Sequence, residues 1–165
     1  MLRGAGGEAK LVAYVLPVEA GQGPGVSELH HFLKGKLPEY MLPGEYVSVA
    51  SWPRTPSGKV DRRALPEPDM ARPELEQAYA PPCNPIQKTL ADIWADVLGR
   101  DRVGIHDNFF DLGGHSLSVM AAIFRINQAF QIKLPVRFVF EEPTIAELAL
   151  TIEEMLLNEI EGMDL

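Results

Sequence analysis

Several features that would define a class of protein are scarce in this sequence. One cysteine, Cys83, occurs among 165 residues, so no internal disulfide can form and we expect a free thiol in a reducing cytoplasm. No apolar run approaches the roughly 20 residues that a membrane-spanning helix needs. The first ten residues lack the apolar region of a signal peptide. We therefore expect neither secretion nor a membrane as partner.

Positive charge is also scarce, and the deficit lies in one half of the chain. Residues 84–165 hold six Lys/Arg and thirteen Asp/Glu, whereas residues 1–83 hold nine and ten. The second half therefore has a net charge of −7, which repels nucleic acid and favours partners with basic patches. An acidic surface that only aids solubility explains the same charge equally well.

The first 52 residues predict a small α+β unit. The segment LVAYVL at 11–16 is typical of a buried strand, and residues 45–51 alternate like a half-buried one. Between them a helical pattern begins at Ser27 and ends before Pro38. Its neighbouring histidines, 30 and 31, point in different directions and have no Cys, Asp or Glu cluster beside them, so we expect no metal site.

Proline marks a change of character in the middle of the chain. Residues 53–85 hold eight of the fourteen prolines, which fix φ, remove hydrogen-bond donors and stiffen the chain. We therefore predict an extended, semi-rigid linker rather than a packed element. The predicted domains are residues 1–66, a linker at 67–83 and a second domain at 84–160.

The second domain has a helical pattern throughout. Apolar residues share one face of 86–98, and Gly99 ends that helix. Further helices are predicted at 116–131, at about 136–140 and at 144–160. The fold class is thus mostly α, a four-helix bundle preceded by a partial α+β subdomain. The loop at 100–115 is long for a compact domain, and such loops are usually functional.

The end of that loop holds the candidate site. In DLGGHSL at 111–117, two glycines precede Ser116 at the start of a helix. Glycine permits sharp turns and close approach, and the positive end of the helix dipole suits a phosphate ester on the serine. Ser116 acting only as the N-cap remains an alternative. A hydrolase nucleophile is disfavoured, because adjacent His115 points elsewhere and Ser118 replaces the second glycine of G-x-S-x-G.

The run DNFFDLGGHSL at 107–117 resembles the attachment motif of peptidyl carrier domains in non-ribosomal peptide synthetases, and the likeness extends over residues 85–154. The resemblance implies that a phosphopantetheinyl transferase moves the arm of coenzyme A onto Ser116. Covalent 4'-phosphopantetheine would then hold an aminoacyl or peptidyl group as a thioester. Gly113, Gly114 and His115 complete this cofactor-binding motif. The implied partners are an adenylation core and a condensation or thioesterase domain.

The helix after Ser116 is apolar on two faces, and a bundle this small must expose one of them. One face, assigned to the core, holds Val119, Ala122, Ile123, Ile126 and Phe130. The opposite face holds Leu117, Met120 and Phe124, with Ala121. Such an exposed stripe usually marks a partner surface, and methionine suits several partners. Alternatively, Phe109 or Phe110 covers the stripe.

Two upstream segments resemble the last two motifs of adenylation domains: LPEYMLPGEYV at 37–47 and PRTPSGKVDRRALP at 53–66. The resemblance implies that Lys59 enters an adenylation active site and stabilises developing charge; Ser57 stands where the family most often has Asn. Matching begins only near Gly7, and we expect no large nucleotide-binding domain within these 165 residues. We therefore expect no adenylation by this chain alone. LPEP at 65–68 resembles the short motif that docks the linker onto the adenylation subdomain. This resemblance implies that the linker lies along residues 11–50.

Three rival functions remain open from the sequence. Residues around Lys59 could form a working adenylation lobe supplied in trans to a separate core. The bundle could be a pure interaction module whose serine stays unmodified. A carrier of polyketide or fatty acyl groups is the third, and both the Gly-Gly-His-Ser motif and the upstream segment argue against it.

Overall fold

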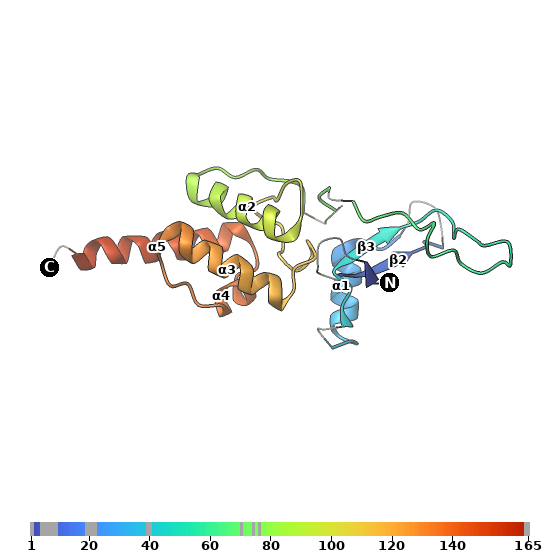
Figure 1. Ribbon diagram of the computed structural model, residues 1–165. Helices are drawn as coiled ribbons and strands as arrows, with labels where there is room; N and C mark the ends of the chain where they lie inside the picture. Colours follow the sequence, from blue (N-terminus) through green and yellow to red (C-terminus); the bar gives the residue numbers. More distant parts are fainter. Residues whose placement is uncertain are drawn as a thin grey trace. The chain divides into compact units, whose positions relative to one another are not determined.

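The computed structural model describes residues 2–3, 10–18, 23–38, 41–69, 71–73, 75 and 77–163. The chain divides into two compact units, Met1–Asp69 and Met70–Leu165. Figure 1 shows their elements in sequence colours. The start of the adenylation-like match, near Gly7, lies outside the described residues.

The first unit is built on a three-stranded sheet in the order β1-β2-β3. β1 (Leu2–Arg3) pairs antiparallel with β2 (Lys10–Val15), and β2 pairs parallel with β3 (Glu45–Ser48). A parallel pair needs a crossover connection, and α1 (Val26–Lys34) lies in it. The two predicted strands and the helix are present with different bounds. β2 and β3 end at Val15 and Ser48, before residues 16 and 51, and α1 runs from Val26, one residue before Ser27, to Lys34, before the predicted end at residue 37.

The end of the first unit lies against its own sheet. Tyr14, on β2, donates a hydrogen bond from its hydroxyl to the Pro66 carbonyl at 2.8 Å. Leu65 beside it is buried, with 7% of its surface exposed. The LPEP segment therefore contacts the sheet, as its resemblance to a docking motif implies.

The described residues of the second unit form a bundle of four helices, which confirms the mostly α class. They are α2 (Pro85–Leu98), α3 (Ser116–Phe130), α4 (Arg137–Glu141) and α5 (Ile145–Met163). The first begins as its sequence dictates, because Asn84 Oδ1 accepts the Gln87 amide at 2.8 Å with Pro85 in the first position. It ends at Gly99, whose φ of +66° glycine tolerates best.

The core of the second unit includes the long loop between α2 and α3. Phe109 and Leu112 of this loop have no exposed surface, and the Phe109 ring lies edge-on to Trp94 of α2 at 4.8 Å between centroids. The rest of the fully covered apolar side chains come from the helices: Leu90, Trp94, Val119, Ala122, Ile126, Val139, Ile145, Leu148 and Ile152. The loop is thus fixed by packing, and it positions the start of α3.

The proline-rich segment behaves differently from the expected extended linker. Leu75 and Ala80 pack against the bundle core, and the Ile105 amide donates to the Ala80 carbonyl at 2.9 Å. The expectation that this stretch is unpacked is therefore wrong for these residues, because the core offers them apolar surface. The predicted carrier boundary at residue 84 stays a prediction. Among the described residues, no helix combines the length and apolarity that crossing a membrane demands.

Candidate functional site

Ser116 lies at the first position of α3 and is exposed. The N-cap is the residue before it, His115, whose extended backbone has φ −146° and ψ 173°. The alternative that Ser116 serves as the N-cap is therefore wrong. The serine side chain projects from the first turn of the helix, at the positive end of its dipole.

His115 and Ser118 cap α3 reciprocally. His115 Nδ1 accepts the Ser118 amide at 3.4 Å, and Ser118 Oγ accepts the His115 amide at 2.7 Å. The Ser118 hydroxyl also donates to the His115 carbonyl at 2.8 Å. The backbone N–H groups of His115 and Ser118 both find acceptors in this way. The pair therefore fixes the start of the helix without a contribution from the Ser116 side chain.

Each of the two positions before His115 requires glycine for a different structural reason. Gly113 has φ +98°, a backbone conformation that side chains rarely adopt. Gly114 packs on Phe109: a Cβ there would lie 2.2 Å from Phe109 Cδ1 and 2.5 Å from its carbonyl oxygen. The space that the sequence suggested for an approaching molecule is, at Gly114, filled by this ring.

The upstream end of the glycine pair is held by a residue that the sequence analysis did not identify. Arg100 is buried and donates from Nε and Nη2 to the Leu112 carbonyl, at 3.0 and 2.8 Å. The contact spans 12 residues and has no local pattern, so the sequence carries no signal for it. Ser116 is thus preceded by a turn fixed at both ends.

This geometry fits a phosphate-linked arm on Ser116. The side chain is exposed, while Leu112 on one side and Ser118 on the other are buried. A phosphodiester on the serine would lie at the helix N-terminus, where the dipole favours negative charge. The residues present therefore suit 4'-phosphopantetheine.

The second apolar face of α3 is uncovered. Leu117, Met120 and Phe124 are 61%, 53% and 69% exposed, and we call these three residues the α3 stripe. Phe109 is in the core, and Phe110 instead stacks on Phe140 at 5.4 Å between ring centroids. The alternative that these phenylalanines cover the stripe is therefore wrong. The core assignment of the opposite face is confirmed.

Lys59 belongs to the first unit and lies exposed in a tight turn. The Thr55 amide donates to the Lys59 carbonyl at 2.8 Å, and Gly58 in between has φ +82°. Arg54 Nη1 donates to the Gly58 carbonyl at 2.8 Å. The chain turns at Ser57–Gly58, and the lysine that follows is exposed.

Comparison with known proteins finds a family match for the second unit and relatives that align with most of the chain. The model of the family described as "Phosphopantetheine attachment site" matches residues 88–152. The chain is 50% identical over 124 residues, 75% of its length, to tyrocidine synthase 3 of Brevibacillus parabrevis. It is 43% identical over 143 residues, 87% of its length, to gramicidin S synthase 2 of Brevibacillus brevis. It spans only 2% and 3% of the length of these relatives.

Among solved structures, the chain is similar to one described as the phosphopantetheine transferase Sfp in complex with coenzyme A and a peptidyl carrier protein. The match has 41% identity and a TM-score of 0.45, and it covers 46% of this chain and 99% of that chain. The attachment-site match includes the loop and helix that hold Ser116. The second unit is therefore a phosphopantetheine-bearing peptidyl carrier domain of the kind that non-ribosomal peptide synthetases contain.

Proposed function

We propose that residues 84–160 work as a peptidyl carrier domain and that Ser116 bears its 4'-phosphopantetheine. The observation that carries this proposal is the position of the serine: it is exposed at the first residue of α3, while its neighbours perform the capping. The matched attachment-site region includes it. Gly113, Gly114 and His115 then set the turn that presents it.

The modification transfers the phosphopantetheine group of coenzyme A to Ser116. Ser116 Oγ forms a bond to the β-phosphorus of coenzyme A, the pyrophosphate bond breaks, and adenosine 3',5'-bisphosphate leaves. The serine proton passes to a base or to solvent. Once attached, the arm supplies a thiol that holds an aminoacyl or peptidyl group as a thioester. Carrier domains are non-catalytic, and tethering raises the effective concentration of the cargo at successive active sites.

The α3 stripe is the proposed surface for partner domains. Three large apolar side chains, Leu117, Met120 and Phe124, stay exposed beside Ser116. Exposed apolar groups of this kind mark interaction sites, and methionine adapts to more than one partner. The proposed partners are a phosphopantetheinyl transferase, an adenylation core and a condensation or thioesterase domain. The net charge of −7 in residues 84–165 favours basic surfaces on them.

The first unit supports a second, conditional function. Lys59 is held outward in a rigid turn, which suits a cation that must reach a substrate phosphate or carboxylate. We propose that it acts only when an adenylation core is present and that this chain alone does not adenylate amino acids. ATP–pyrophosphate exchange by the isolated chain would contradict this, and Lys59-dependent thioester loading with an added core would support the in-trans role.

An intact-mass spectrum tests the carrier proposal. The chain is incubated with coenzyme A and a broad-specificity phosphopantetheinyl transferase, beside a Ser116→Ala variant and a Ser57→Ala control that changes another exposed serine. We expect one added phosphopantetheine in the wild type and the control, and none in Ser116→Ala. A wild-type protein that is folded by circular dichroism but gains no mass would favour the unmodified interaction module instead.

A further inference from the structure

The described part of residues 71–80, which lies in the predicted linker, contacts the loop that leads to Ser116. The Ala80 carbonyl accepts the Ile105 amide at 2.9 Å. The guanidinium of Arg102 lies over the Tyr79 ring, 4.6 Å from its centroid. These contacts join the segment to residues 102–105 of the loop between α2 and α3.

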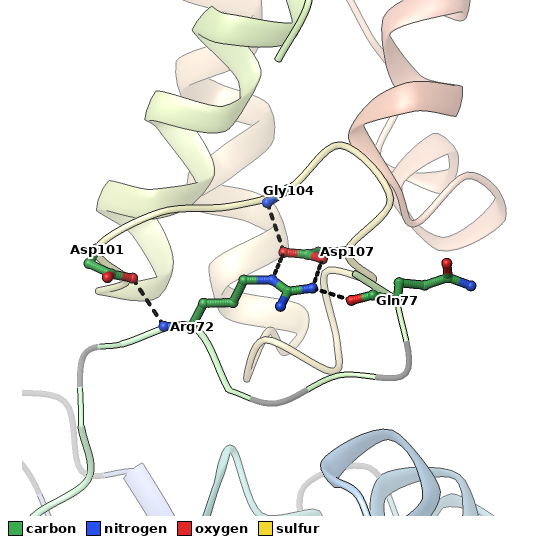
Figure 2. A network of polar contacts seen from close by, with 5 residues as sticks. All are labelled: Arg72, Gln77, Asp101, Gly104 and Asp107. Carbon is green, nitrogen blue, oxygen red and sulfur yellow. Dashed lines mark hydrogen bonds and ion pairs between the residues drawn. The ribbon is translucent and has the colours of Figure 1, made fainter. Parts of the chain in front are cut away.

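Arg72 makes the strongest of these connections (Figure 2). Its Nε donates to Asp107 Oδ2 at 2.7 Å, and its Nη2 donates to Asp107 Oδ1 at 2.6 Å. The same Nη2 donates to the Gln77 carbonyl at 2.6 Å, and the Arg72 amide donates to Asp101 Oδ1 at 3.0 Å. One residue therefore closes the segment on itself and fastens it to both ends of residues 101–107.

The Asp107 carboxylate that accepts these bonds is itself held in place by the loop. Its side chain has no exposed surface, and its Oδ2 also accepts the Gly104 amide at 2.7 Å. A Cβ on Gly104 would lie 3.1 Å from both carboxylate oxygens, so the loop closes tightly around the carboxylate. The Asp107 backbone continues into Asn108 and the core residue Phe109, so the ion pair orders the start of the attachment motif.

Arg100 makes a second connection between the segment and the loop, closer to the serine. Besides the two bonds to the Leu112 carbonyl, its Nη1 donates to the Ala71 carbonyl at 3.4 Å. One buried guanidinium therefore contacts the residue beside Arg72 and the residue that precedes the glycine pair. Its planar, multi-donor head suits this role, because a lysine ammonium lacks the fork that binds one carbonyl with two donors.

Only three residues lie between the Leu112 carbonyl and Ser116. Gly113 turns the chain at φ +98°, Gly114 rests on Phe109, and His115 caps the helix. Because this path is short and packed, an anchor at Leu112 sets where the serine stands relative to α3. Losing that anchor would loosen the turn while the exposed α3 stripe stays in place.

We propose that residues 71–80 are a working part of the carrier unit and that Arg100 is a positioning residue for the modification of Ser116. Arg72 fastens the segment to Asp107, and Arg100 joins the segment to the turn that presents the serine. This inference rests on the proposed attachment at Ser116. The two arginines would affect the rate of phosphopantetheine transfer and not the affinity of the transferase for the carrier.

Steady-state kinetics of phosphopantetheine transfer to the full chain test the proposal. We compare wild type with Arg100→Met, Arg100→Lys and Arg72→Met, at a temperature where circular dichroism shows each variant folded. Lys88→Met, which removes an exposed cation paired with Asp92 on α2, is the matched control. Because a misplacement of about 1 Å costs up to about 100-fold in rate, we expect kcat to fall at least about tenfold in Arg100→Met. We expect KM for the carrier to stay within about twofold, since the stripe is unchanged.

The other variants complete the test. Arg72→Met should lower kcat in the same direction, and Arg100→Lys should not restore it, while Lys88→Met should match wild type. The Gly113 and Gly114 amide resonances should shift in the arginine variants and not in the control. Wild-type kcat in Arg100→Met or Arg100→Lys, or a rise in KM alone, would overturn the positioning role. Wild-type kcat in Arg72→Met would overturn the role of the segment. If the wild type itself is not modified, the proposed function fails instead.

Discussion

Arg72 and Asp107 form a two-bond ion pair although they lie 35 positions apart in the sequence. The carboxylate side chain is fully covered and the arginine side chain is 10% exposed. The hydrogen bond to Asp107 raises the pKa of the Arg72 guanidinium above its ordinary value. A raised pKa gives stability that is lost only as pH rises through that value, so alkaline conditions in which proteins are handled leave the arginine charged.

Removing the cation of this pair should destabilise the carrier unit. Arg72→Met leaves the Asp107 carboxylate buried without its partner, and we expect the free energy of unfolding to fall by about 3 kcal/mol. Urea unfolding followed by helical circular dichroism measures the change. Lys88→Met, on an exposed pair, should cost about 0.5 kcal/mol or less. Adding Asp107→Asn to Arg72→Met should recover part of the loss, and equal losses for Arg72→Met and Lys88→Met would contradict the prediction.

The same contacts predict where the carrier unit begins. A fragment of residues 70–165 retains Arg72 and Ala80, whereas a fragment of residues 84–165 lacks both. We expect the shorter fragment to be less stable by about the loss predicted for Arg72→Met, because Asp107 is again left unpaired. Parallel urea titrations check this. Identical midpoints would mean that residues 70–83 add nothing to the fold of the bundle.

Gly114→Ala should disturb the turn before the serine. The added methyl would meet Phe109 at 2.2 Å, and that ring cannot withdraw because it has no exposed surface and lies against Trp94. Such overpacking costs about 1–3 kcal/mol. Gly35→Ala is the control, since its Cβ would meet only an ordinary contact at 3.8 Å. A Gly114→Ala protein with wild-type melting temperature would show that the turn adapts.

The α3 stripe should be separable from the fold. Glutamine at Leu117, Met120 or Phe124 should change the free energy of unfolding by about 0.5 kcal/mol or less, because these side chains are exposed. KM for the transferase should rise about tenfold or more for at least one of them, as expected of an interface hot spot. Leu150→Gln on α5, at 62% exposure, is the matched control. The same KM for the three stripe variants and Leu150→Gln would contradict a role of the stripe in binding the transferase.

Lys59 should matter for loading and not for modification. Lys59→Ala should accept phosphopantetheine at the wild-type rate, because the lysine belongs to the other unit. With a separate adenylation core, we expect the same variant to load its thiol far more slowly than wild type. Lys36→Ala, another exposed lysine of the first unit, controls for charge. Equal loading by both variants would remove the proposed role of Lys59.

Local patterns in the sequence predict most of the second unit. Asn84, Pro85 and Gly99 mark the ends of α2, and the spacing of Val119, Ala122 and Ile126 gives the buried face of α3. The sequence predicts the start of α3 at Ser116 because the motif and the helix boundary coincide there. Each of these signals depends on neighbours within about a turn of helix, where backbone geometry limits the choices.

Contacts between distant segments were not predictable in this way. Arg72 lies in a proline-rich stretch that resembles a solvated linker, and no periodicity relates it to Asp107. Arg100 is an ordinary charged residue after Gly99 until the fold brings the Leu112 carbonyl to it. His115 was missed as the cap because Ser, Thr, Asp and Asn are the usual residues there. Tertiary packing decides all three.

The reciprocal cap at the start of α3 has a consequence for how the protein changes state. Since His115 and Ser118 secure the helix end, its integrity does not depend on what the intervening serine carries. The apo and holo forms should therefore share one backbone, differing in mass, in the reach of the arm and in the charge that the phosphodiester adds at the helix N-terminus. A partner domain that distinguishes them would have to sense the arm itself, because the helix that bears it presents the same face in both.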